Sequence, residues 1–183
     1  MKQLAVYFPG IGYHVDKPLL YYAKQVANEA GYLDTIQVSY KFAGGNIRGD
    51  KEKMRETFLD LYRQAEACLA KVEWEKYREI LFISKSIGTV ISAAYAKKHQ
   101  ISCRQILYTP LEETYEFQPK EAIAFLGDQD PWSRVEEVFR ISKEQEVPIY
   151  RYEGANHSLE VEDSLKNLEI LKDVMEKTAS YLG

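Results

Sequence analysis

The sequence predicts an α/β protein, a three-layer α/β/α sandwich around a mainly parallel sheet of about six strands. Short apolar runs alternate along the chain with longer stretches whose apolar residues recur at helical spacing. The residues that could carry chemistry follow the apolar runs, where open parallel sheets gather their functional groups. The 183 residues show no internal repeat, linker or low-complexity segment. We therefore expect one domain over residues 1–183.

Strands are expected where short apolar runs end at turn residues or charges. The first run, Leu4 to Phe8, stops at Pro9-Gly10. The other five strands are expected at residues 36–42, 80–84, 106–108, 122–126 and 147–152.

Helices are expected between these strands. Apolar residues recur at helical spacing from Pro18 to Ala30, and Gly31 suits a C-terminal cap. Residues 43–49 contain three glycines and are expected to form a loop. The other helices are expected at about residues 54–72, 87–98, 133–143 and 161–181, the last with a core stripe of Leu165, Leu168, Leu171, Val174, Met175 and Leu182.

Composition argues against several classes of protein. With 24 basic and 28 acidic residues the net charge is −4, and the basic residues are scattered, which is not typical of nucleic-acid binding. No apolar stretch approaches the roughly 18 residues of a membrane span, and the N-terminal run is too short for a signal peptide. Cys68 and Cys103 show no disulfide or metal spacing, and Cys68 falls on the apolar face of a predicted helix. We therefore expect a cytoplasmic protein with reduced, buried thiols and no membrane or nucleic-acid partner.

The most informative segment is ISKSIGTVIS, residues 83–92. Ser86 follows an apolar run, precedes a helix-forming stretch, and has the small residues Ser84 and Gly88 two positions to either side. A strand that turns sharply into a helix at a serine lifts a nucleophilic Oγ above a sheet. Ser86 is therefore the candidate nucleophile; the alternative is a serine that only caps the helix.

A serine nucleophile needs a base, and the base needs a carboxylate that orients it. The segment AFLGDQDPW offers Asp128 and Asp130 after a predicted strand. We favour Asp130 as the orienting acid, although its place before Pro131 also suits a helix N-cap. In the other arrangement Asp128 orients the base and Asp130 only caps the helix.

The chain has three histidines, and their positions differ. His99 ends a predicted helix and is expected to be exposed. His14 lies in the loop after the first strand and is expected to line a pocket. His157 follows the last strand in GANHS, which makes it the candidate base; the alternative is a loop or capping histidine.

An oxyanion hole would complete the site, because charge that develops on a carbonyl oxygen needs preorganised N–H donors. The Ile87 amide, at a helix N-terminus, is one candidate donor. The Ile11 amide in the glycine-containing loop PGIG is the other, with Gly12 and Tyr13 as alternatives. The loop can also be read as a plain glycine-rich turn.

Taken together, PGIG, SKSIG, GDQDP and GANHS follow one another in the order of the α/β-hydrolases, and the chain resembles that family from Leu4 to the C-terminus. Two positions depart from its pattern: Pro9 stands where many members have histidine, and Ser84 replaces a glycine. The nearest likeness is to small, lidless, dienelactone-hydrolase-like members. The resemblance implies a minimal α/β-hydrolase fold.

The substrate side is less specific. Residues 109–121 are too few for a helical lid, so the site should be shallow and open unless a partner subunit covers it. The side chains expected to line it are Tyr13, His14, Tyr115, Phe117 and Trp132, and aromatic walls favour apolar or aromatic groups. Glu112, Glu113 and Glu116 would make the rim acidic, while Lys85 and Arg134 would oppose that.

The sequence therefore predicts a serine hydrolase with the triad Ser86, His157 and Asp130 that acts on a small ester or thioester through an acyl-enzyme. No metal or organic cofactor is implied, and a homodimer is left open. One alternative is a non-catalytic binding or scaffold protein of the same fold. Another is an enzyme that cleaves amide or carbon–carbon bonds.

Overall fold

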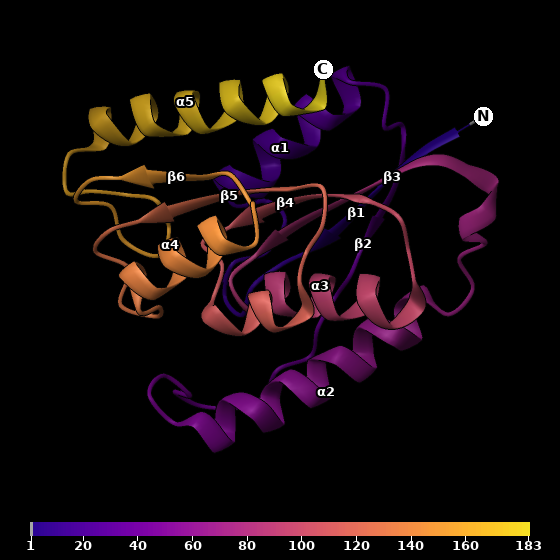
Figure 1. The fold of residues 1–183 in the computed structure, drawn as a ribbon, viewed down its shortest axis with the longest axis horizontal. Helices are drawn as coiled ribbons and strands as arrows, with labels where there is room; N and C mark the ends of the chain where they lie inside the picture. Colours follow the sequence, from indigo (N-terminus) through magenta and orange to yellow (C-terminus); the bar gives the residue numbers. More distant parts are fainter. Residues whose placement is uncertain (1) are drawn as a thin grey trace.

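The computed structural model describes residues 2–183 and is built on one six-stranded sheet (Figure 1). The strand order is β2-β1-β3-β4-β5-β6, and all neighbouring strands are parallel. The predicted fold class is confirmed. The strands are β1 Lys2–Phe8, β2 Asp34–Gln37, β3 Tyr77–Lys85, β4 Arg104–Tyr108, β5 Ala122–Gly127 and β6 Ile149–Tyr152.

Helices cover both faces of this sheet. Figure 1 shows α1 and α5 on one face and α2, α3 and α4 on the other, with α2 outside α3. A short 3₁₀ segment, η2, packs against α3 and α4. The helical segments are α1 Pro18–Glu29, α2 Lys51–Leu69, α3 Ile87–His99, α4 Val135–Glu144, α5 Ser164–Leu182, and the 3₁₀ turns η1 Trp74–Lys76 and η2 Glu112–Phe117.

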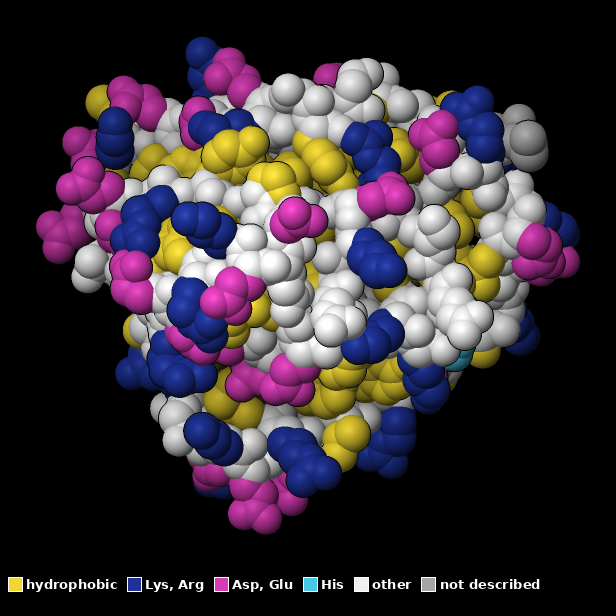
Figure 2. All heavy atoms as spheres, in the orientation of Figure 1, with side chains coloured by type: hydrophobic (Ala, Val, Ile, Leu, Met, Phe, Trp, Pro, Cys, Tyr) yellow, Lys and Arg dark blue, Asp and Glu magenta, His cyan; other side chains and the backbone are white. Residues whose placement is uncertain are grey.

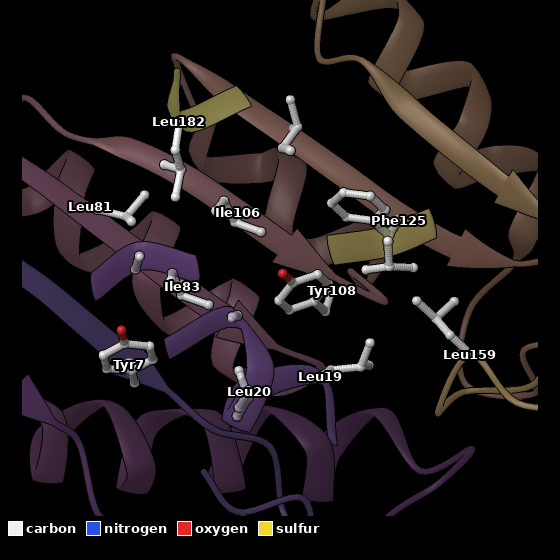
Figure 3. Packing of buried hydrophobic residues seen from close by; sticks show 14 of the residues in the cluster. Tyr7, Leu19, Leu20, Leu81, Ile83, Ile106, Tyr108, Phe125, Leu159 and Leu182 are labelled. Atoms are coloured by element: carbon white, nitrogen blue, oxygen red, sulfur yellow. The ribbon is translucent and has the colours of Figure 1, made fainter. Parts of the chain in front are cut away.

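The alternation of side chains along each strand divides the core in two. Ala5 and Tyr7 of β1 point toward α1 and α5, whereas Val6 and Phe8 point toward α2 and α3. Figure 3 shows the α1/α5 side, where Tyr108 lies among aliphatic side chains from several elements. Burial on both faces explains why these strands are continuous apolar runs.

Several element boundaries differ from the predictions by a few residues, and two of them lie near the functional edge. The second strand was expected at 36–42, but β2 ends at Gln37, and the chain then runs over the carboxyl edge of the sheet without regular structure up to α2. The helix expected from Ser133 begins at Val135, with Arg134 at its N-cap position.

The predicted core stripe of the last helix is wrong at its start. Leu165 and Leu168 are 74% and 63% exposed, while Ile170 and Val174 are buried. At about 100° per residue, Leu165 lies roughly 140° around the helix from Ile170, so the two cannot share a buried face. The helix that packs on α1 therefore faces inward along Ile170, Val174, Thr178 and Leu182.

The surface and the cysteines complete the description. Basic and acidic side chains are interspersed over the face shown in Figure 2. Cys103 is buried as predicted, but Cys68 is exposed and the predicted burial of its thiol is wrong; both cysteines are free. Within residues 2–183, no helix combines the length and apolar character needed to cross a bilayer.

Candidate active site

The turn from β3 into α3 holds Ser86 in an unusual backbone conformation. Ser86 has φ 57° and ψ −129°, a strained combination for a residue with a Cβ. Its amide donates to the Tyr108 carbonyl (3.0 Å), which holds the turn to β4. Although Ser86 occupies the N-cap position of α3, its side chain makes no capping hydrogen bond. The Oγ is therefore free to serve another partner.

The two small residues that flank Ser86 are required for different physical reasons. A Cβ at Gly88 would lie 2.2 Å from the Phe8 carbonyl oxygen and 2.5 Å from the Pro9 carbonyl oxygen, so β1 passes almost in contact with the first turn of α3. Ser84 fits where the family pattern has glycine because its Oγ, buried within the sheet, donates to the Ile106 carbonyl (3.2 Å). This departure from the pattern leaves the turn intact.

Three side chains from distant parts of the chain meet above the sheet. His157 Nε2 lies 2.7 Å from Ser86 Oγ, and His157 Nδ1 lies 2.7 Å from Asp130 Oδ2. A carboxylate can only accept, so Nδ1 carries the proton and Nε2 accepts from the serine hydroxyl. The structure thus brings together the three residues that the sequence singled out, in the geometry that nucleophilic catalysis requires.

The two aspartates have different partners. The Asp130 side chain is fully buried, and its second oxygen accepts from the Trp132 amide (2.9 Å). Asp128 Oδ1 instead accepts from the Gly154 amide (2.8 Å) and so holds the loop that carries His157. The proposed helix cap at Asp130 is wrong, because α4 starts four residues after Pro131.

Burial and nearby charges set the proton affinity of the base. Burial, followed by the charge of Lys85, lowers the pKa of His157, whereas the hydrogen bond and charge of Asp130 raise it. A lowered pKa keeps the imidazole neutral, and hence able to act as a base, at neutral pH.

Lys85 does not lie on the rim as expected. Its side chain is completely buried, and its Nζ donates to the His157 carbonyl (2.7 Å) beneath the site. Sequence reasoning missed this position because a lysine before the nucleophile reads as a surface charge. Its place as the last residue of an apolar strand was the available signal.

The predicted oxyanion donors lie in suitable segments. A Cβ on Gly10 would be 3.1 Å from Ser86 Cβ, so the PGIG loop runs next to the nucleophile. Gly10 and Tyr13 hydrogen-bond to each other through their backbones, which engages the Tyr13 amide. The Ile11, Gly12 and Ile87 amides make no hydrogen bond to any described residue, so Ile11 and Ile87 remain the candidate pair, with Gly12 as the alternative to Ile11.

Ser86 and His157 open into a cavity of about 330 Å³. Of the five predicted lining residues, Tyr13 and Trp132 line it, and the Trp132 ring centroid is 5.6 Å from that of His157. The other three do not line this cavity. His14 is exposed and pairs with Asp16, while Tyr115 and Phe117 of η2 line a neighbouring groove instead.

The missing wall comes from the segment between β2 and α2 and from the first turn of α2. Phe42 and Ile47 of the segment and Met54 of α2 line the cavity, so the site is not as open as the sequence suggested. The signal was available: a loop that follows a strand of a parallel sheet emerges at the functional edge, and this one contains apolar residues.

A larger groove of about 670 Å³ lies beside this cavity. The two hollows share Met54, Ile87 and Leu111. Phe58 of α2 and Phe117 of η2 extend the groove away from Ser86, and their rings stack at a centroid distance of 6.1 Å. Apolar side chains thus extend from the cavity into the groove between α2 and η2, which charged side chains also line.

Solved structures with the same architecture identify the fold. An α/β serine hydrolase homologue from Coxiella burnetii is 19% identical over 100% of this chain and 85% of that one, with a TM-score of 0.70. The esterase Pf2001 from Pyrococcus furiosus is 13% identical over 99% and 82% of the two chains (TM-score 0.66). Est1E from Butyrivibrio proteoclasticus is 14% identical over 97% and 89% (TM-score 0.63).

These likenesses and the strand order define the α/β-hydrolase fold, and the chain has this fold, as the resemblance in its sequence implies. No protein-family model matches the sequence, and no curated protein matches it significantly. The likeness to dienelactone-hydrolase-like members therefore stays a prediction.

Proposed function

We propose that this protein is a serine hydrolase that cleaves a small ester or thioester through an acyl-enzyme. The observation that carries the proposal is the chain of two 2.7 Å contacts from Ser86 through His157 to Asp130. The strained backbone of Ser86 supports it further, because strain of this kind is retained where it exposes a reacting group.

The proposed reaction has two halves, acylation of Ser86 and hydrolysis of the acyl-enzyme, and His157 transfers protons in both. Ser86 Oγ attacks the substrate carbonyl while His157 Nε2 takes its proton, and Asp130 stabilises the imidazolium. The Ile11 and Ile87 amides hold the oxyanion. His157 then protonates the leaving alcohol or thiol, and the acyl group stays on Ser86. Water, deprotonated by His157, hydrolyses this acyl-enzyme and restores the serine.

The walls of the site favour an apolar acyl group. Phe42, Ile47 and Trp132 enclose the space beside the serine, and Met54 and Phe58 continue the apolar surface into the neighbouring groove, which charged side chains also line. An acyl chain that leaves Ser86 along this groove would exclude water from apolar surfaces on both sides.

Labelling with a fluorophosphonate probe tests the proposal directly. We expect the wild-type protein to be labelled at Ser86, as located by mass spectrometry of the digested protein, because only an activated serine reacts with such probes. Ser92→Ala is the matched control, since Ser92 is buried in α3 and bonds only to the Thr89 carbonyl. Folded wild-type protein that stays unlabelled would contradict the proposal and favour a non-catalytic binding protein.

A second test separates the two aspartates. Asp130→Asn should lower kcat by about 10⁴-fold, because an amide at this position favours the wrong tautomer of the base. Asp128→Asn should have a much smaller effect, since Asp128 contacts only the backbone of Gly154 and the neighbouring Gln129. Steady-state kinetics on one activated ester measure both. Equal losses in the two variants would show that Asp130 is not the orienting acid.

A further inference from the structure

Lys85 has an ionisable side chain that is buried in the protein interior. It is the last residue of β3 and directly precedes Ser86, and its relative exposure is 0%. No carboxylate of residues 2–183 lies within ion-pair distance of its Nζ. A buried ammonium without an ion pair opposes folding, so stability alone does not explain a lysine here.

The shifted pKa of Lys85 also indicates that this residue lowers the stability of the fold. Burial lowers the pKa of Lys85 to about 7, against an ordinary value of 10.5 in the unfolded chain. Between these two values the unfolded state binds the extra proton, so stability rises with pH across this window. Below pH 7 the native protein carries the full penalty of the buried charge. The reason for a lysine at this position therefore lies in its contacts within the candidate site.

Those contacts join three loops of the candidate site. Lys85 Nζ donates to the His157 carbonyl at 2.7 Å, on the base loop. The same Nζ lies 4.8 Å from the centre of the Tyr13 ring, on the loop that carries the oxyanion donor Ile11. The main chain of Lys85 continues into Ser86 itself. One side chain thus ties the nucleophile strand to the other two loops.

We propose that Lys85 is the positioning residue of this site: its buried Nζ holds the backbone of His157 so that the imidazole bridges Ser86 and Asp130. This inference rests on the proposed hydrolase function for its kinetic consequence, but not for the contact itself. The contact is a direct hydrogen bond to the backbone of His157, which lies on an irregular loop and whose side chain is only 18% exposed.

Lys85 also acts on His157 through its charge. Asp130, on the loop after β5, and Glu160, on the segment before α5, favour the ammonium, whereas an imidazolium at His157 would oppose it. The phenol of Tyr13 beside Lys85 and the buried phenol of Tyr108 stay neutral, since burial raises the pKa of Tyr13 to about 12 and also raises that of Tyr108. The charged lysine therefore keeps His157 in its neutral, basic form at lower pH.

The first test needs no turnover. In protein labelled with ¹³C-histidine, NMR titration of Lys85→Met should show the pKa of His157 above its wild-type value, because the opposing charge is gone. The matched control is Lys97→Met, since Lys97 also donates to a backbone carbonyl, that of Glu116, but is exposed on α3. His14→Gln and His99→Gln assign the other two signals. An unchanged His157 titration in Lys85→Met would overturn the electrostatic part of the proposal.

The second test is kinetic. Lys85→Met should lower kcat by about tenfold or more with little change in KM, because a misplaced base slows the chemical step rather than binding. The acid limb of kcat/KM should move to higher pH together with the pKa of His157. Lys85→Gln, which keeps a donor without the charge, should recover part of kcat but not the pH shift.

The outcomes separate the two proposals. If the wild-type protein neither turns over nor labels, yet Lys85→Met shifts the His157 titration, the hydrolase function fails and the contact stands. If the wild-type is active and folded Lys85→Met keeps its kcat and pH profile, the positioning role is wrong while the hydrolase function stands.

Discussion

Ser86→Ala should lower kcat for ester hydrolysis by roughly 10⁴- to 10⁶-fold, because the alanine leaves His157 with no nucleophile to activate. The size follows from the geometry: the hydroxyl is 2.7 Å from the base and has no capping role that its loss would disturb. Steady-state kinetics on an activated ester, with thermal unfolding as a check on folding, measure the change.

The same experiment can show that the groups act as a unit. Adding His157→Ala to Ser86→Ala should cost almost nothing further, since residues of one catalytic unit are strongly non-additive. Ser92→Ala should keep wild-type kinetics. A Ser86→Ala variant that retains a tenth of the activity would place the reaction elsewhere on the molecule, and additive losses would show that Ser86 and His157 act separately.

Gly88→Ala should lower the free energy of unfolding by about 3 kcal/mol or more, through overpacking against backbone that cannot give way. The added Cβ would meet the Phe8 carbonyl oxygen at 2.2 Å and the Pro9 carbonyl oxygen at 2.5 Å. Helix propensity has the opposite sign, since alanine in a helix is favoured over glycine by about 1 kcal/mol. The sign of the measured change therefore decides between the two effects.

Urea denaturation of Gly88→Ala and of a matched variant, Gly45→Ala, provides the measurement. A Cβ at Gly45 would meet no heavy atom within 4 Å, so its stability should stay close to that of the wild-type. A Gly88→Ala protein as stable as the wild-type, or more so, would mean that β1 and α3 are not in the contact described.

The local sequence pattern was sufficient to predict those features that depend on one segment alone. Apolar runs became the parallel strands, and Ser86, Asp130 and His157 each follow one of them at the carboxyl edge. Because parallel strands place their carboxyl ends at the same edge, chain order alone predicted that these residues would meet.

The sequence pattern failed to predict burial where a neighbouring element determines which face of a segment is covered. The helical spacing of Cys68 and Leu165 predicts that both are buried, yet both are exposed. The elements that pack against each helix determine which of its faces is buried. Tyr115 and Phe117 were expected beside the serine, but η2 packs against α3 and α4 and places them at the neighbouring groove instead. Aromatic composition cannot show in which direction a short segment packs.

The sequence of this protein determined its fold class, the candidate nucleophile and base, and the two aspartates between which the acid had to be chosen, since these depend on period, turn chemistry and order along the chain. The tertiary structure alone decided which aspartate reaches His157, which loop walls the cavity, and that Lys85 lies beneath the site. The reason is the same in each case. Distances between side chains and their removal from water arise only when distant segments pack together, and no local pattern records them.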